Sequence, residues 1–312
     1  MKCLVAVVGP TAVGKSQLAL RLAQDFDGEI VNADSRQVYR YMDIGTAKPS
    51  RAELSLVRHH LIDIINPDGS FSLAIFQKLA LEAIANIQQR HKLPLLVGGS
   101  GLYVWSVLEG WKIPPVAPNP ELRQSLEVMA KEKGGYALYQ ELQKLDRVAA
   151  TKIMPSNLRR VIRALEICQT TGQPVSQLWH KQPPPFRVLT IGLTVRRDDL
   201  YRRIDSRVDE MIKHGLVDEV KDLVARGYSL DLPSMSGIGY KQIGMFLDEK
   251  LDLPTAAQRI KHETHRFARH QYSWFRLDDA RIHWLDEYSD IQKEADGLVS
   301  VFLDDGLAEE AG

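Results

Sequence analysis

The sequence has few cysteines, no long apolar run and no excess of charge of either sign. Its two cysteines, Cys3 and Cys168, are too few for a disulfide framework or a zinc site. No stretch has the uninterrupted apolar length of a membrane span, and no secretory signal precedes the first predicted strand. We therefore expect a cytoplasmic protein without membrane contact, whose thiols are buried and reduced.

The zero net charge, 40 Lys and Arg against 40 Asp and Glu, would argue against nucleic acid binding if the charges were evenly spread. Residues 259–276 carry five Arg or Lys against one Glu, and residues 286–312 carry nine acids against Lys293 alone. In the sum, the acidic C-terminal segment cancels basic surfaces that can still bind an anionic partner locally.

One short motif predicts a phosphate site. An apolar run of strand length, residues 3–8, precedes it, and residues 16–24 follow with apolar side chains at helical spacing. In such a strand–loop–helix unit the glycines let backbone N–H groups converge on phosphate oxygens, and the helix N-terminus adds partial positive charge. The motif G-x-x-x-x-G-K-[ST] is formed by Gly9, Pro10, Thr11, Ala12, Val13, Gly14, Lys15 and Ser16.

Strands and helices alternate after this phosphate loop. Short apolar segments predict strands at 29–32, 61–65 and 94–97, and residues 72–90 read as an amphipathic helix with Ser72 as its N-cap. This order predicts an α/β fold, a doubly wound, mostly parallel sheet of the P-loop NTPase type. Ligands collect at the carboxyl ends of such strands, where the phosphate loop, Asp34 and residues 98–101 would meet.

Two proline-rich segments, at 114–120 and 183–185, bracket residues that read as helices only. Strand character returns at 187–195, which favours a helical domain inserted into the core. The alternative is that these helices pack directly on the sheet. The predicted division is a first core part at 1–118, a helical insertion at 119–186, a second core part at 187–285 ending in a basic helix (255–275), and a partly disordered acidic tail at 286–312.

Asp34 follows the second predicted strand and lies beside the phosphate loop in this fold. A carboxylate there can take a proton from a nucleophile that attacks a phosphorylated substrate, although an acid before a helix also commonly caps it. None of the predicted strands ends in the isolated acid that holds magnesium for ATP hydrolysis. Position alone therefore leaves the reaction open.

Several further motifs accompany the phosphate loop: residues 30–39 (IVNADSRQVY), 43–49 (DIGTAKP), 93–103 (LPLLVGGSGLY), 160–166 (RVIRALE) with Thr171 and Gly172, 237–241 (GIGYK) and 271–275 (QYSWF). Together these motifs resemble the tRNA dimethylallyltransferases (IPP transferases) over nearly the whole chain, from Val5 to about Trp284. The resemblance implies transfer of a dimethylallyl group from dimethylallyl diphosphate to N6 of the adenosine next to the anticodon (position 37) of tRNA, with release of pyrophosphate.

For the chemistry, the resemblance implies that the phosphate loop, Gly9 to Ser16, holds the diphosphate leaving group. Lys15 and a magnesium ion bound through Ser16 would stabilise its growing charge, and Thr11 would bond to the diphosphate. Asp34 would be the general base, and Arg207 a second clamp on the diphosphate; without the resemblance, a solvated helix arginine is the simpler interpretation.

For RNA, the resemblance implies binding of the tRNA anticodon stem-loop, with the target base extruded into a pocket. The insertion would contact the stem through phosphate and 2′-OH groups. No obligate protein partner is inferred. The residues expected to contact tRNA are Asp34, Ser35, Arg36, Gln37, Ser100, Arg123, Arg159, Arg160, Arg163, Gly239, Tyr240 and Lys241.

The sequence departs from the family pattern at three places. Ser100 stands where the family has Thr and keeps a hydroxyl, residues 154–157 (MPSN) replace the usual His-Pro-Asn-Asp, and His270 replaces an Arg. The sequence leaves two alternative functions. The first is prenylation of free adenine nucleotides, which would not need the insertion. The second is an ATP-dependent small-molecule kinase or a nucleotide switch, and the missing magnesium-binding acid argues against it.

Overall fold

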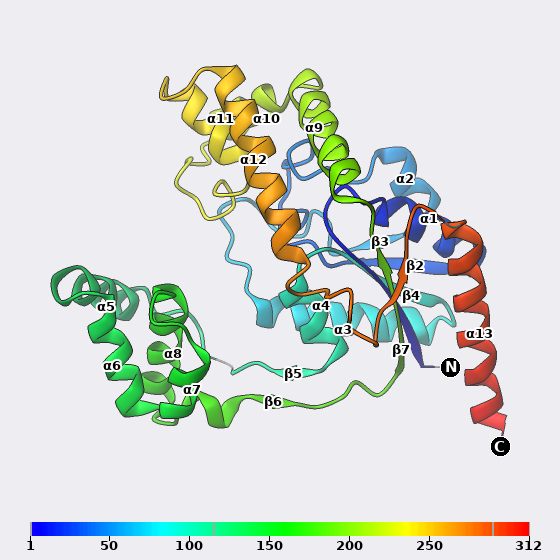
Figure 1. Cartoon of the computed structure of the whole chain (residues 1–312), viewed down its shortest axis with the longest axis horizontal. Coiled ribbons are helices and arrows are strands. Elements are labelled where there is room, and N and C mark those ends of the chain that lie inside the picture. The colour runs from blue at the N-terminus through cyan, green and yellow to red at the C-terminus, as the bar shows by residue number, and fades with distance from the viewer. Residues whose placement is uncertain (1, 115, 289, 312) are drawn as a thin grey trace. The chain divides into compact units, whose positions relative to one another are not determined.

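A computed structural model describes residues 2–114, 116–288 and 290–311, with side chains through residue 306. Its main feature is a six-stranded sheet in which neighbouring strands run parallel. The strand order β3-β2-β4-β1-β7-β8 places β1 in the interior of the sheet (Figure 1). The predicted α/β fold is confirmed. The strands are β1 (Cys3–Val8), β2 (Gly28–Asn32), β3 (His59–His60), β4 (Leu93–Val97), β7 (Arg187–Leu193) and β8 (His283–Leu285).

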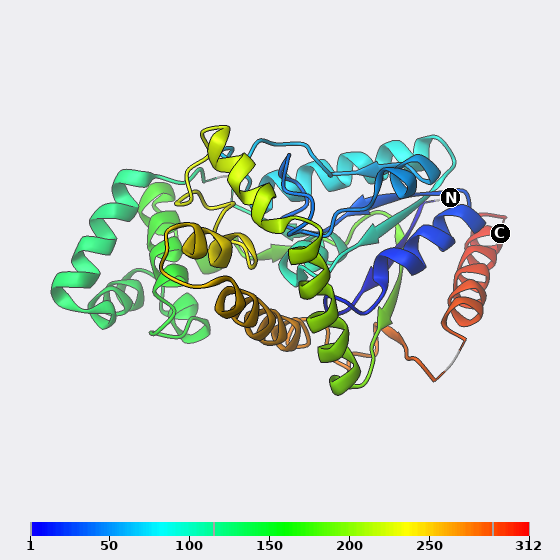
Figure 2. The same cartoon turned by 90° about the horizontal axis from the view of Figure 1, so that it is seen from above.

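Helices cover both faces of this sheet because its central strands are apolar on both sides. All residues of β1, β2 and β4 are buried. Helices α1 and α13 pack against each other and share one core with β1, while α3 covers the opposite face (Figure 2). The helices here are α1 (Lys15–Asp25), α2 (Arg51–Leu56), α3 (Leu73–Gln89), α4 (Gly101–Leu108) and α13 (Ile291–Ala311).

A second apolar core lies beyond the carboxyl ends of the strands. It joins four helices to the segment after β2, through residues such as Val38, Met42, Leu216 and Tyr240. This core places α9, α11 and α12 beside the loops that follow β1 and β2. The four helices are α9 (Arg197–Lys213), α10 (Leu216–Ala225), α11 (Tyr240–Leu247) and α12 (Leu253–Gln271).

Residues 109–183 form a separate compact unit, and residues 1–108 with 184–312 form the other. The smaller unit has its own apolar core, which includes Leu138, Leu142, Val161 and Leu165. Its ends are closed by the antiparallel pairing of β5 with β6. Its elements are β5 (Trp111–Lys112), α5 (Pro120–Lys133), α6 (Gly135–Leu145), α7 (Arg147–Lys152), α8 (Leu158–Thr171), the 3₁₀ helix η1 (Val175–Leu178) and β6 (His180–Lys181).

Two local expectations differ from the structure. The third strand is β3 (His59–His60) and not residues 61–65, because Leu61 and Asp63 adopt positive φ angles of 64° and 54°, which turn the chain out of the sheet. The acidic tail forms helix α13 where partial disorder was expected, because Ala295 and Val299 are buried in the core shared with α1.

Both cysteines are free and buried, as predicted. Across the described ranges, no helix combines the length and apolar character needed to cross a bilayer.

Candidate active site

A cavity of about 750 Å³ opens at the carboxyl ends of β1, β2 and β4, the place that the parallel topology predicts for a ligand. All of its lining residues belong to the larger unit. They include Thr11, Lys15 and Ser16 from the phosphate loop, Asp34 to Gln37 from the loop after β2, and Ser100. The structure thus brings together three loops that the sequence analysis expected to meet.

The phosphate loop has the backbone that its glycines allow. Gly9 has a φ of 136°, and a Cβ there would lie 2.4 Å from the carbonyl oxygen of Leu193 in β7, so only glycine fits. Gly14 also has a positive φ, 104°, directly before α1 begins at Lys15. The loop therefore leads into a helix N-terminus, whose free N–H groups attract anions.

Lys15 is the cation that the phosphate loop contributes to the cavity. Its Nζ donates to the carbonyl oxygen of Pro10 at 2.6 Å. Burial lowers the pKa of Lys15 from 10.5 to about 7; the nearby Asp34 carboxylate opposes this shift and the Arg207 guanidinium adds to it. Lys15, Asp34 and Arg207 are therefore close enough to act on one another electrically, and a bound anion would restore the charge of Lys15.

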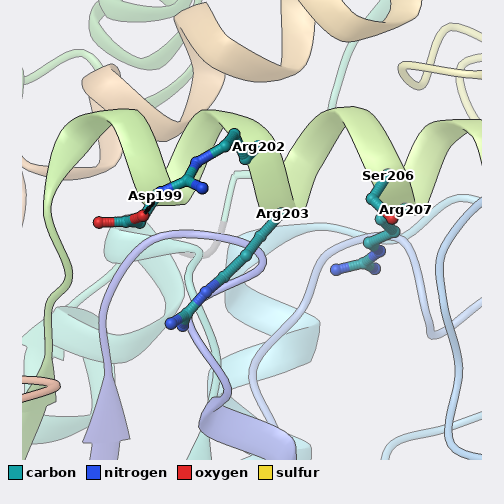
Figure 3. A pocket seen from close by; sticks show the side chains of 5 residues that line it. All are labelled: Asp199, Arg202, Arg203, Ser206 and Arg207. Carbon is teal, nitrogen blue, oxygen red and sulfur yellow. Dashed lines mark hydrogen bonds and ion pairs between the residues drawn. The ribbon is translucent and has the colours of Figure 1, made fainter.

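Arg207 approaches the phosphate loop from α9. Its Nη1 donates to Thr11 Oγ1 at 3.4 Å. Burial lowers its pKa, and Asp34 partly offsets this effect. Figure 3 shows Arg203 and Arg207 leaving α9 on the side of the loop between β1 and α1. The sequence analysis predicted a site role for Arg207, and the structure places it at the phosphate loop.

Asp34 is held by its own loop. Its Oδ1 accepts from the Arg36 backbone N–H at 2.8 Å, and its N–H donates to Asn32 Oδ1 at 3.1 Å. The next residue, Ser35, donates its N–H to Ser100 Oγ at 3.3 Å, which joins the loops after β2 and β4. These bonds orient the carboxylate in the cavity and explain why a hydroxyl at residue 100 is useful.

The other residues of the larger unit expected to contact tRNA are Arg36 and Gln37, whose side chains bond to backbone carbonyls, and residues 239–241, of which two line the cavity. Arg36 donates to the carbonyl oxygens of Pro233 (2.9 Å) and Ser234 (3.2 Å), and Gln37 donates to backbone carbonyls of its own loop. Gly239 and Tyr240 line the cavity, with the Tyr240 ring buried, whereas Lys241 is exposed and outside the lining.

The arginines of the smaller unit also divide into two groups. Glu166 is fully buried and accepts from Arg123 Nε and Nη2 at 2.9 and 2.8 Å, and it pairs with Arg163. Burial alone would raise the pKa of Glu166; the hydrogen bonds from Arg123, Asn119 N–H and Arg163 overcome this and lower it to about 2. Arg159 and Arg160 are exposed. Of the four arginines of this unit predicted as site residues, Arg123 and Arg163 bind this buried carboxylate, and Arg159 and Arg160 do not.

Among the cavity residues to which the sequence analysis gave no role are two polar ones, Arg203 and Gln271. Arg203 lines the cavity, and its spacing of four from Arg207 on one helix was the available signal. Gln271 is buried: its Oε1 accepts from the Thr11 N–H and its Nε2 donates to the Gly99 carbonyl, both at 2.8 Å. Gln271 joins two loops that lie far from it in sequence. The 271–275 motif contained it, but nothing local to that motif indicated this role.

Fold and site define a phosphate-loop α/β protein whose cavity holds cations at one end and polar loops at the other. A family model described as IPP transferase matches residues 37–278. The chain belongs to the IPP transferase family.

Curated relatives and solved structures extend the match to nearly the whole chain. A tRNA dimethylallyltransferase of Roseiflexus castenholzii is 52% identical over 301 residues, which cover 96% of this chain and 98% of the relative. The crystal structure of a tRNA isopentenylpyrophosphate transferase from Bacillus halodurans has a TM-score of 0.71 at 42% identity, covering 100% of this chain and 98% of that one. A eukaryotic dimethylallyltransferase acting on tRNA gives a TM-score of 0.82 at 28% identity, covering 99% and 80%.

Proposed function

We infer that this chain is a tRNA dimethylallyltransferase, which transfers a dimethylallyl group to N6 of the adenosine at position 37, next to the anticodon. Membership of the IPP transferase family at about half identity over nearly full length supports this function. The single structural observation that carries the mechanism is the placement of Lys15, Arg207 and Asp34 around one cavity.

At the cationic end, the phosphate loop would hold the diphosphate of the donor. As the allylic C–O bond breaks, negative charge grows on the leaving diphosphate. Lys15, Arg207 and the N–H groups at the start of α1 would stabilise this additional charge, and so would bind the transition state more strongly than the less charged diphosphate of the bound donor. Thr11 would add a hydroxyl on the same side, since its Oγ1 already contacts Arg207.

At the polar end, the acceptor adenosine would enter the cavity extruded from the anticodon loop. Its N6 forms the new bond to the allylic carbon, diphosphate leaves from that carbon, and the proton from N6 passes to Asp34. We propose Asp34 Oδ2 as the proton acceptor, because Oδ1 already accepts from the Arg36 N–H. Ser35, Gln37 and Ser100 would surround the base.

A magnesium ion fits these residues. Within the described ranges no group of three His, Cys, Asp or Glu could hold a metal, and Mg²⁺ bound to a diphosphate typically needs only one or two protein oxygens. Ser16, exposed at the start of α1 and lining the cavity, would supply one. When bound, the ion would neutralise part of the diphosphate charge.

The experiment is prenyl transfer by the purified protein from labelled dimethylallyl diphosphate, offered unmodified tRNA, AMP and ATP in parallel. We expect label in tRNA, recovered as N6-dimethylallyl adenosine by mass spectrometry, without any need for ATP. Transfer to free nucleotides but not to tRNA, or release of phosphate from ATP in step with transfer, would overturn the proposal.

A further inference from the structure

Glu219 on α10 lies outside the cavity lining but holds the loop that forms one of its walls. Its carboxylate accepts hydrogen bonds from three consecutive backbone N–H groups, those of Asp43 (2.8 Å), Ile44 (2.7 Å) and Gly45 (3.1 Å). It also accepts from the hydroxyl of Tyr240 at 2.6 Å. Consecutive N–H groups that converge in this way form an anion-binding concavity, here filled by a side chain of the protein itself.

The Tyr240 ring restricts the path of the loop that carries Asp43, Ile44 and Gly45. The ring is almost completely buried. Burial, and to a smaller extent the Glu219 charge, raises the pKa of the Tyr240 hydroxyl, so this hydroxyl acts as a hydrogen-bond donor. A Cβ on Gly45 would lie 2.6 Å from the ring, so the loop passes tightly over the aromatic face. Glu219 therefore joins three segments that are distant in sequence: the 43–48 loop, α10 and the start of α11.

The 43–48 loop in turn fixes the side chain of Gln37. Gln37 Nε2 donates to the carbonyl oxygens of Thr46 at 3.1 Å and Ala47 at 3.0 Å. The reverse orientation of the amide would place its oxygen against two carbonyl oxygens, so the geometry selects this one. Both amide hydrogens are used, and Oε1 is left as an acceptor on a residue that lines the cavity.

We propose that Glu219 is a positioning residue for the acceptor: through the 43–48 loop it holds Gln37 with its carbonyl oxygen ready to accept from an N–H group of the target base. The proposal rests on the proposed function. Removing the carboxylate would free the three N–H groups, loosen the carbonyls of Thr46 and Ala47, and let the Gln37 amide turn. The diphosphate end would not change, since its contacts come from the phosphate loop and α9.

The test is a double-mutant cycle in single-turnover prenyl transfer at saturating donor. Glu219→Gln keeps the size but offers one acceptor oxygen and an NH₂ group, which opposes the backbone donors. We expect Glu219→Gln and Gln37→Ala each to slow transfer about 10-fold or more, and the double variant to be no slower than the worse single variant within about threefold. Donor affinity should stay within about twofold.

The matched control is Asp218→Asn, an exposed acid one residue away on the same helix, which should transfer at the wild-type rate. Multiplicative losses in the double variant, or an unchanged rate for Glu219→Gln, would overturn the proposal. Should Glu219→Gln fail to fold, Tyr240→Phe is the substitute, since it removes one donor while the carboxylate keeps its three backbone bonds. We expect Tyr240→Phe to slow transfer less than Glu219→Gln does, and to cause no further slowing when Gln37 is already Ala. Failure of the wild type to modify tRNA would instead refute the proposed function.

Discussion

At the scale of single residues, the site depends on charges held close together without full neutralisation. Lys15 and Arg207 both interact electrostatically with Asp34, and burial lowers the pKa of both cations. The Asp34 carboxylate would accept a proton from the attacking amine, while Lys15 and Arg207 would bind the diphosphate. Lys15, Arg207 and Asp34 would therefore serve both the departure of the diphosphate and the removal of the proton from the amine.

Asp34→Asn should lower kcat by about 10²–10⁴ and leave donor binding nearly unchanged, because a proton acceptor is lost while the phosphate loop is kept. Calorimetry with dimethylallyl diphosphate and single-turnover kinetics with tRNA measure the two effects separately. A variant that retained full turnover would exclude Asp34 as the base.

Donor binding at about pH 8 should take up close to one proton. Free Lys15, with a pKa of about 7, is mostly neutral at this pH, and the bound diphosphate would raise its pKa and charge it. Affinity should thus weaken as pH rises above 7. Calorimetry in two buffers of different ionisation enthalpy measures the uptake, and Lys15→Arg, which is always charged, should abolish it. Equal heats in both buffers for the wild type would contradict the assignment.

At the scale of elements, α8 shows how one helix divides its arginines between two tasks. Arg163 is committed to Glu166, which is fully buried and also pairs with Arg123. Arg159 and Arg160 are exposed on the same helix. We propose that this exposed pair contacts the tRNA stem, while Arg123 and Arg163 hold the smaller unit together.

Arg159→Ala with Arg160→Ala should weaken tRNA binding and flatten its salt dependence, with the logarithmic slope falling by about 1 for each lost phosphate contact. The single-turnover rate at saturating tRNA should not change. Arg163→Ala should instead cost about 2 kcal/mol of stability, because a buried carboxylate loses a charged partner, and leave the slope unchanged. Filter binding over a salt series and thermal melts separate the variants; an unaltered slope in the double variant would refute an RNA contact at this face.

At the scale of the whole molecule, the C-terminal helix completes the sheet domain. Although the segment is acidic, α13 carries an apolar stripe that includes Ala295, Val299 and the partly buried Leu298 and Phe302. This stripe covers the face of the sheet that α1 leaves open, and it packs against β1, β7 and β8 (Figure 2). Acidic residues of the helix lie on its solvent side, so an acidic composition here does not indicate disorder.

Ending the chain after Asp290 should lower the free energy of unfolding by roughly 3 kcal/mol or more, since several apolar side chains of α13 and their contacts in β1 and α1 become exposed. Chemical denaturation of both forms measures the loss. Since the cavity lies at the carboxyl ends of the strands and includes no residue of α13, donor affinity below the midpoint should be unchanged. Equal unfolding midpoints would show that the helix adds nothing to the core.

Local signals in the sequence are enough to specify the strand–loop–helix unit around the phosphate loop and the α/β class. These depend on local signals: the buried run from Cys3 to Val8, the glycines at 9 and 14, and the helical spacing that follows. A parallel sheet then brings the ends of β1, β2 and β4 to one edge, so the sequence pattern alone predicts Asp34 and Ser100 near Lys15.

The polar groups that hold the site in shape, by contrast, are set by contacts between segments far apart in the sequence. Gln271 meets Thr11 across 260 residues of sequence, and Glu219 meets Gly45 across 174. The fold also makes Arg163 pair with a buried acid while Arg160 stays exposed, a distinction between like residues on one helix. Hydrogen bonds and buried ion pairs depend on distances between segments that the fold brings together, and no local period or composition records those distances.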